Sequence, residues 1–162
     1  MSRRHSAQER VVLPDVKYNS VFLTKFINKV MRGGKKALAE KIVYGALDRL
    51  ATKHKLDPME AFESAVANVK PNLEVNSVRV GGANYQVPCV VDEKRAGTLA
   101  IRWLILFSSK RSEKTMIEKL SEEIFDASNN RGGSVKKKEE THKMADANRA
   151  FAHFAVKKGG GR

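Results

Sequence analysis

Residues 73–91 read LEVNSVRVGGANYQVPCVV, two Val-rich runs joined by Gly81-Gly82. A Gly-Gly pair favours a two-residue β-hairpin turn, because both central residues need a positive φ. The pattern predicts a hairpin in which Val80 pairs with Ala83, so that one face is apolar and the other polar. The expected apolar face holds Val78, Val80, Tyr85 and Val87, and the polar face Ser77, Arg79, Asn84 and Gln86. A lone hairpin is marginal in water, so we expect its base to rest on its own domain and its tip on a partner.

Helical periodicity surrounds this hairpin on both sides. Apolar spacing and caps predict helices over about 19–32, 36–53, 57–70, 92–109, 112–128 and 134–154. The fourth is apolar on nearly every side and therefore central, with Trp103 expected as a core residue rather than a base-stacking platform. On the last, Met144, Ala147, Phe151 and Phe154 are expected to pack inward.

These elements predict a mainly α fold: one bundle-like domain of about six helices, with a two-stranded β-hairpin protruding between the third and fourth helices. The expected organisation is an extended basic arm over 1–18, a helical domain over 19–156 that includes the hairpin at 73–91, and a flexible tail over 157–162. A chain of 162 residues is long enough for one domain with a real core.

The charge is strongly basic. Lys and Arg number 31 against 18 Asp and Glu, a net charge of +13 with a pI near 10.0, while 41% of the residues are hydrophobic. This composition describes a folded basic protein, and its first inferred partner is a polyanion. We expect the surplus cations to cover one continuous side of the body.

Three groups of basic residues are candidate phosphate contacts. The first group is Arg3, Arg4 and Arg10 in the arm, which is either a solvated tail or a phosphate-binding arm; the net charge favours the second. The second is a helix stripe of Lys25, Lys29, Arg32 and Lys36 that no acidic residue interrupts. The third is Lys136, Lys137 and Lys138, placed in the first turn of the last helix. Because cations there oppose the helix dipole, a phosphate at the helix terminus is expected.

Catalytic and metal-binding patterns are missing from the sequence. It contains no HExxH, Walker, GxSxG or CxxC motif, and its four His show no ligand spacing, so we predict neither an enzyme, a metal site nor a cofactor. The single Cys89 allows no internal disulfide, which suits a reducing compartment. No apolar run is long enough to span a bilayer, so no membrane partner is expected and a cytoplasmic location is predicted.

Four segments together resemble one known family. They are FINKVMRGGKK at 26–36, RVGGANYQVP at 79–88, TLAIRW at 98–103 and GGSVKKKEETHKMADANRAFAHF at 132–154. In sequence and in spacing they resemble the small-subunit ribosomal protein seven family of bacterial type, over nearly the whole chain. The chain departs from it at Val78, where the family commonly has an Arg, and after Phe154, where a Lys/Gly tail replaces a short aromatic ending.

The resemblance implies a structural protein that binds the 3′ major domain of small-subunit rRNA, nucleates assembly of the head, and lies near the exit tRNA site and the mRNA path. It implies ribosomal proteins nine, eleven, thirteen and nineteen of the small subunit as neighbours, in a cytoplasmic or organellar ribosome. The implied RNA contacts are Arg3, Arg4, Lys35, Lys36, Arg79, Lys94, Arg95, Arg102, Arg111, Lys136, Lys137 and Lys138. The implied tRNA-facing residues are Gly81, Gly82, Asn84 and Gln86, to which we add Arg149.

Two alternatives remain open at this point. A basic helical body with a β-ribbon arm also describes some DNA-compacting proteins that bind the minor groove. An enzyme acting on RNA ranks last, because no general base is paired with a nucleophile. Equal affinity for duplex DNA and folded rRNA is the observation that favours the DNA-binding class.

Overall fold

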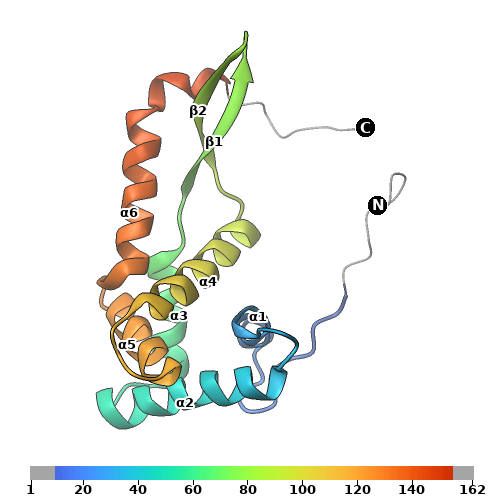
Figure 1. Ribbon diagram of the computed structural model, residues 1–162, viewed down its shortest axis with the longest axis vertical. Helices are drawn as coiled ribbons and strands as arrows, with labels where there is room; N and C mark the ends of the chain where they lie inside the picture. The colour runs from blue at the N-terminus through green and yellow to red at the C-terminus, as the bar shows by residue number, and fades with distance from the viewer. Residues whose placement is uncertain (1–9, 155–162) are drawn as a thin grey trace.

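Six α-helices, one 3-10 helix and one β-hairpin make up residues 10–154, the part of the chain that the computed structural model describes (Figure 1). In chain order they are α1 (Val21–Val30), α2 (Lys36–His54), α3 (Pro58–Val69), β1 (Leu73–Val80), β2 (Ala83–Val90), α4 (Glu93–Lys110), α5 (Met116–Ser128), α6 (Gly132–Ala147) and η1 (Arg149–Phe154). The predicted fold, mainly helical with a hairpin between the third and fourth helices, is confirmed. Arg3, Arg4 and the expected tail at 157–162 lie outside the described residues.

The hairpin has the predicted register. Val80 pairs with Ala83 and Val78 with Tyr85, and Gly81 and Gly82 have φ angles of 57° and 90°. The four residues of the polar face are all exposed, as expected. On the apolar face Val87 is fully buried.

The apolar face of the hairpin is covered by the end of the same chain. The Tyr85 ring lies 5.3 Å from that of Phe151 and 5.2 Å from that of Phe154, both on η1. In Figure 1 α6 rises alongside the hairpin, and η1 crosses to it near the tip. The hairpin is therefore supported along its length and leaves its polar face open.

The helical body is built around α4 and α5. Leu104 and Ala100 of α4 have no exposed surface, and Trp103 is 9% exposed, which confirms it as a core residue. The α1 helix packs on this core through Phe26, whose ring meets Phe62 of α3 edge-on at 5.0 Å. Burial of one face of α1 leaves its opposite face to solvent.

The α5 helix begins at Met116, four residues after the expected start at Ser112. The Thr115 side chain accepts a hydrogen bond from the N–H of Glu118, and the Glu118 carboxylate accepts one from the N–H of Thr115. This capping box fixes the true start, because it satisfies two amides that lack partners within the helix. Residues 111–115 thus form a loop rather than a first helical turn.

The start of α6 also differs from the expectation. The helix begins at Gly132, so Lys136 is its fifth residue and not part of its first turn. The carboxylate of Glu123 accepts hydrogen bonds from the N–H (3.0 Å) and the hydroxyl (2.6 Å) of Ser134. A buried carboxylate therefore occupies the helix terminus where a phosphate was expected, and that expectation is wrong.

The inward face of α6 was assigned incorrectly as well. Met144 is 46% exposed and Ala147 is exposed, whereas Thr141 and Ala145 are buried. The expected continuous helix stops at Ala147, and the following turn is a 3-10 helix with three residues per turn instead of 3.6. Phe151 and Phe154 therefore pack on Tyr85 from a separate element, and Met144 and Ala147 stay exposed on α6.

Candidate nucleic-acid interface

The exposed side of α1 and the start of α4 enclose a groove of about 690 Å³. Lys25 and Lys29 project from α1 one helical turn apart, since Leu23, Phe26 and Ile27 anchor the other side of that helix in the core. Lys94 and Thr98 of α4 line the opposite wall. Two exposed lysines at one-turn spacing can each address a phosphate of one strand.

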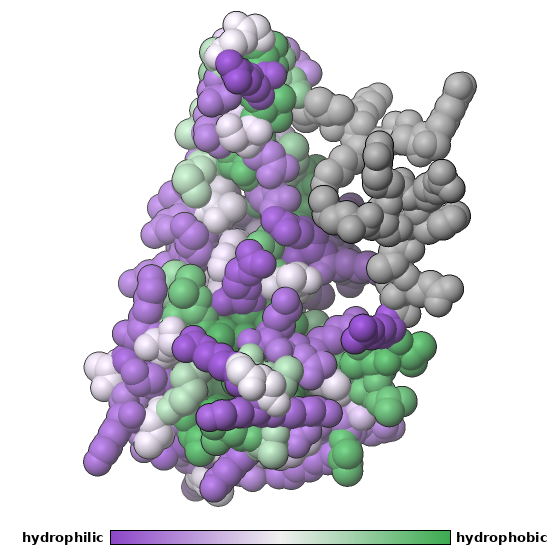
Figure 2. Space-filling model, turned by 45° about the vertical axis from the view of Figure 1, so that its right-hand side comes forward, coloured by the Kyte–Doolittle hydropathy of each residue, from purple (hydrophilic) through white to green (hydrophobic). Residues whose placement is uncertain are grey.

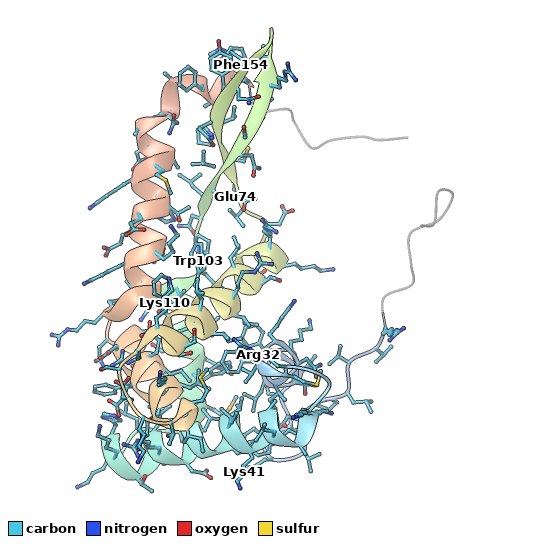
Figure 3. The ribbon with its side chains drawn as sticks, in the orientation of Figure 1. Arg32, Lys41, Glu74, Trp103, Lys110 and Phe154 are labelled. Carbon is cyan, nitrogen blue, oxygen red and sulfur yellow. The ribbon has the colours of Figure 1, made fainter. Side chains whose placement is uncertain are left out.

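A second groove, of about 650 Å³, lies where the α1–α2 loop meets the end of α4 and the start of α5. Arg32 and Lys35 of the loop and Lys114 and Lys119 from the α5 side contribute its basic groups, and no carboxylate lines it. Figure 3 places Arg32 beside α1, between α4 above it and α2 below it.

Arg102 lies on α4 between residues that line the two grooves. It is exposed on α4, four residues after Thr98 of the first groove and three before Ile105 of the second, so all three share one helix face. No carboxylate among residues 10–154 pairs with Arg102. We call the combined region the cationic surface, defined by Lys25, Lys29, Arg32, Lys35, Lys94, Arg102, Lys114 and Lys119.

Figure 2 brings the α1 side of the molecule forward and shows hydrophilic residues across most of it, with hydrophobic residues gathered at the lower right beside the grey atoms. The exposed large apolar side chains of the arm are Val11, Leu13 and Val16. Arg10, a predicted contact, is exposed at the start of the described residues.

Basic residues near the C-terminal end of α2 are paired with carboxylates of α5 instead. Lys53 Nζ lies 2.6 Å from a Glu122 carboxylate oxygen, and Arg49 lies 3.6 Å from Glu118. Burial alone raises the pKa of Glu122, but the hydrogen bond from Lys53 and the charges of Lys53 and His54 bring that pKa below its ordinary value. Since their charge is compensated within the protein, these cations contribute less to an anion-binding field than exposed cations such as Lys25 and Lys29.

Three further predicted contacts make ion pairs of their own. Lys36 lies 3.6 Å from Glu40 one turn along α2, and Arg95 lies 3.3 Å from Glu74 of β1. The Arg111 guanidinium contacts three carboxylates, those of Glu113 at 3.0 Å, Glu123 at 3.0 Å and Asp126 at 2.7 Å.

The Arg111 contacts decide its role. Burial alone lowers the pKa of its guanidinium, but the hydrogen bonds to Asp126, Glu123 and Glu113 raise that pKa well above its ordinary value. A cation held by three carboxylates is satisfied within the protein, and breaking a buried pair is costly. The geometry therefore favours a structural role for Arg111 over an RNA contact.

The lysine run of α6 is separate from the cationic surface. Lys136 is exposed, Lys137 lies 3.3 Å from Glu140, and Lys138 Nζ donates to the Asn68 carbonyl at 2.7 Å. In Figure 1 α6 and α1 lie at opposite sides of the molecule. The expectation of one continuous basic side does not hold for this run.

The remaining predicted residues lie at the far end of the hairpin. Arg79, Gly81, Gly82, Asn84 and Gln86 are all exposed at or near the tip. Arg149 is exposed at the start of η1, the element that packs on Tyr85. The structure thus brings the predicted tRNA-facing residues into one region, well away from the α1–α2 end of the body (Figure 1).

The sequence analysis missed Lys114 and Lys119. Both line the second groove, and Lys119 Nζ also lies 3.5 Å from the carbonyl oxygen of Ser109. Recognising Thr115-x-x-Glu118 as a capping box places Lys114 in the loop ahead of α5. That signal was present in the sequence.

Residues 10–154 contain neither a metal-binding cluster nor a membrane-spanning helix. No cluster of three or more His, Cys, Asp or Glu side chains there has a geometry that holds a metal ion. Within the same range, every helix is too short or too polar to cross a membrane.

An open basic surface on a helical scaffold, with a protruding hairpin, describes a structural nucleic-acid-binding protein. Residues 2–149 match the protein family described as ribosomal protein S7p/S5e. A small ribosomal subunit protein uS7 from Rickettsia felis is 65% identical over 158 residues, which cover 98% of this chain and 99% of the relative. A uS7 protein from Rickettsia bellii is 66% identical over 158 residues, covering 98% and 97%. The chain belongs to this small-subunit ribosomal protein seven family and is a structural ribosomal protein, not an enzyme.

Proposed function

We propose that this chain binds the 3′ major domain of small-subunit rRNA directly and nucleates folding of the subunit head. The observation that carries the proposal is the cationic surface, where cations from α1, the α1–α2 loop, α4, the loop before α5 and α5 line two grooves. Folded RNA is recognised largely through shape, phosphates and 2′-hydroxyl groups, which suits a concave basic surface built from several helices.

The hairpin has a separate part in this proposal. Its exposed polar face, with Arg79, Asn84 and Gln86, and the adjacent Arg149 lie close to exit-site tRNA and the mRNA path. The rest of the surface faces small-subunit proteins nine, eleven, thirteen and nineteen in a cytoplasmic ribosome. The support is the exposure of these side chains together with the membership of the family.

Charge reversal on α1 tests the rRNA proposal. Replacing Lys25 and Lys29 by Glu removes two cations from the first groove and introduces repulsion, so we expect a loss of affinity for a 3′ major domain fragment of roughly 100-fold. The matched control reverses Lys41 and Lys110, exposed lysines outside both grooves and labelled in Figure 3. Filter binding measures both variants, and far-UV circular dichroism checks that helicity is unchanged.

Two results contradict the proposal. One is an equal loss of affinity in the Lys25/Lys29 and Lys41/Lys110 variants, since a nonspecific charge effect then explains binding. The other is competition by duplex DNA at the same concentration as by the rRNA fragment. That second result favours a DNA-compacting protein, the alternative that the basic body with a β-ribbon left open.

A further inference from the structure

The second groove differs from the first because no carboxylate lines it. Its lining combines apolar side chains with the basic groups of Arg32, Lys35, Lys114 and Lys119. The apolar lining residues are Val30, Met31, Leu38, Ala39, Ile42, Ile105 and Met116. We call this region the α2–α5 cavity; at about 650 Å³ it has the size of a small-molecule site.

Leu38 is the unusual member of this wall. It is the third residue of α2 and keeps 52% of its surface exposed, although the next residue, Ala39, is buried. Met116, the first residue of α5, lines the same cavity and is half-buried. Apolar side chains left open in a concave site favour a ligand with an apolar surface of its own.

The basic lining residues set a second requirement for the ligand. Four cations line the cavity, and no carboxylate is among the lining residues. An uncharged ligand leaves these cations uncompensated, and an inorganic phosphate leaves the apolar walls uncovered. The ligand must therefore combine a flat or apolar part with negative charge beside it.

The first groove differs from this cavity in its charge. There Glu93 lies 3.8 Å from Lys70 and contributes negative charge to a lining that also includes the apolar Phe22 and Ile101. The α2–α5 cavity offers its cations without a carboxylate that competes for them.

We propose that the α2–α5 cavity receives one unstacked nucleotide of the bound rRNA. Its base lies against Leu38 and Met116, and its flanking phosphates lie at Arg32, Lys35, Lys114 and Lys119. A nucleobase has apolar faces and is bracketed by phosphates, which matches both requirements, and proteins commonly recognise RNA through bases splayed out of the helix. The inference rests on the proposed rRNA-binding function and adds a specific subsite to it.

The experiment removes the apolar wall without touching a charge. Leu38→Ala and Met116→Ala are measured for affinity to the 3′ major domain fragment across a series of salt concentrations. Stacking of a base on an aromatic side chain contributes roughly 5- to 150-fold in affinity. For these aliphatic walls we expect each variant to lose roughly 5- to 20-fold in affinity, at the lower part of that range. The slope of log affinity against log salt concentration should stay at the wild-type value, because the number of phosphate contacts is unchanged.

The matched control is Leu56→Ala. Leu56 is 38% exposed and follows the opposite end of α2, away from both grooves, and its truncation should leave rRNA affinity within twofold of wild type. Denaturant unfolding of all three variants checks the fold. Leu38 is half-exposed, so its variant keeps the test valid even if the Met116 variant unfolds more readily.

The outcomes distinguish failure of the nucleotide proposal from failure of the proposed rRNA binding. Unchanged affinity in Leu38→Ala, together with weakened binding by the Lys25/Lys29 charge reversal, overturns the nucleotide proposal and leaves rRNA binding standing. Unchanged affinity in both overturns rRNA binding through this surface. A Leu38→Ala variant that binds rRNA normally but loses affinity for a neighbouring small-subunit protein assigns the cavity to a protein partner, which also overturns the proposal.

Discussion

Glu123 holds three parts of the fold together although its carboxylate is 1% exposed. It accepts hydrogen bonds from Ser134 at the start of α6 and from Arg111 in the loop before α5. Removing one partner of such a buried pair costs about 3–5 kcal/mol, because the other charge stays desolvated. The contacts that fix α6 therefore come from one carboxylate in the middle of α5.

Gly133 offers a direct test of how closely α6 approaches α4. A Cβ at this position would lie 2.5 Å from the Phe107 ring, so Gly133→Ala should destabilise the protein by about 1–3 kcal/mol. Gly97→Ala is the control, since its Cβ would meet Phe22 at 3.8 Å, an ordinary contact, and Ala in a helix interior should add roughly 0.5–1 kcal/mol. Urea unfolding measures both, and equal stabilities for the two variants would contradict the packing described.

Residue-level prediction from sequence succeeded where the cause was local. Lys25 and Lys29 were placed on the exposed side of a helix because the spacing of their apolar neighbours is a short-range signal. The structural role of Arg111 was not predictable in this way. Its partners Glu123 and Asp126 lie 12 and 15 residues further along the chain, on α5, whose start differs from the expected one. Whether a cation is paired or open depends on long-range contacts that periodicity does not encode.

At the scale of elements, the hairpin was the most predictable part of the chain. Its turn, register and two faces all follow from Gly81-Gly82 and the alternation around them. The partner of its apolar face was not predictable in the same way. Tyr85 packs on Phe151 and Phe154 of η1, and a helix ending at Ala147 is a prerequisite for that contact.

Shortening the hairpin tests the proposed role of its tip. Removing Arg79, Val80, Ala83 and Asn84 takes two residues from each strand, so the Gly-Gly turn and the pairing of Val78 with Tyr85 are kept. The tip should retract by about 7 Å, given roughly 3.3 Å per strand residue. We expect unchanged affinity for the rRNA fragment and faster loss of exit-site tRNA from assembled ribosomes, measured by tRNA dissociation.

The result that counts against this role is the reverse pattern. A loss of rRNA affinity with normal tRNA retention would make the tip part of the anchoring surface. The retained Tyr85 contacts with η1 keep the rest of the hairpin supported, so that outcome would not reflect a collapsed strand pair.

At the scale of the whole molecule, charge is distributed unevenly between compensated and open regions. Arg49 and Lys53 near the C-terminal end of α2 pair with Glu118 and Glu122, whereas Lys25, Lys29 and Arg102 are exposed to solvent. The total of +13 in the sequence predicted a polyanion partner but not this division. The division arises from which helices face each other, which is a property of the tertiary fold.

The measurement that tests the central claim most directly is the salt dependence of rRNA binding. Replacing Lys25 and Lys29 by Ala should each reduce the slope of log affinity against log salt concentration by about 0.7 to 1, since each removes one phosphate contact. Lys41→Ala should leave the slope unchanged. A slope that stays at the wild-type value in the Lys25 and Lys29 variants, or that falls equally in the Lys41 variant, would contradict the account.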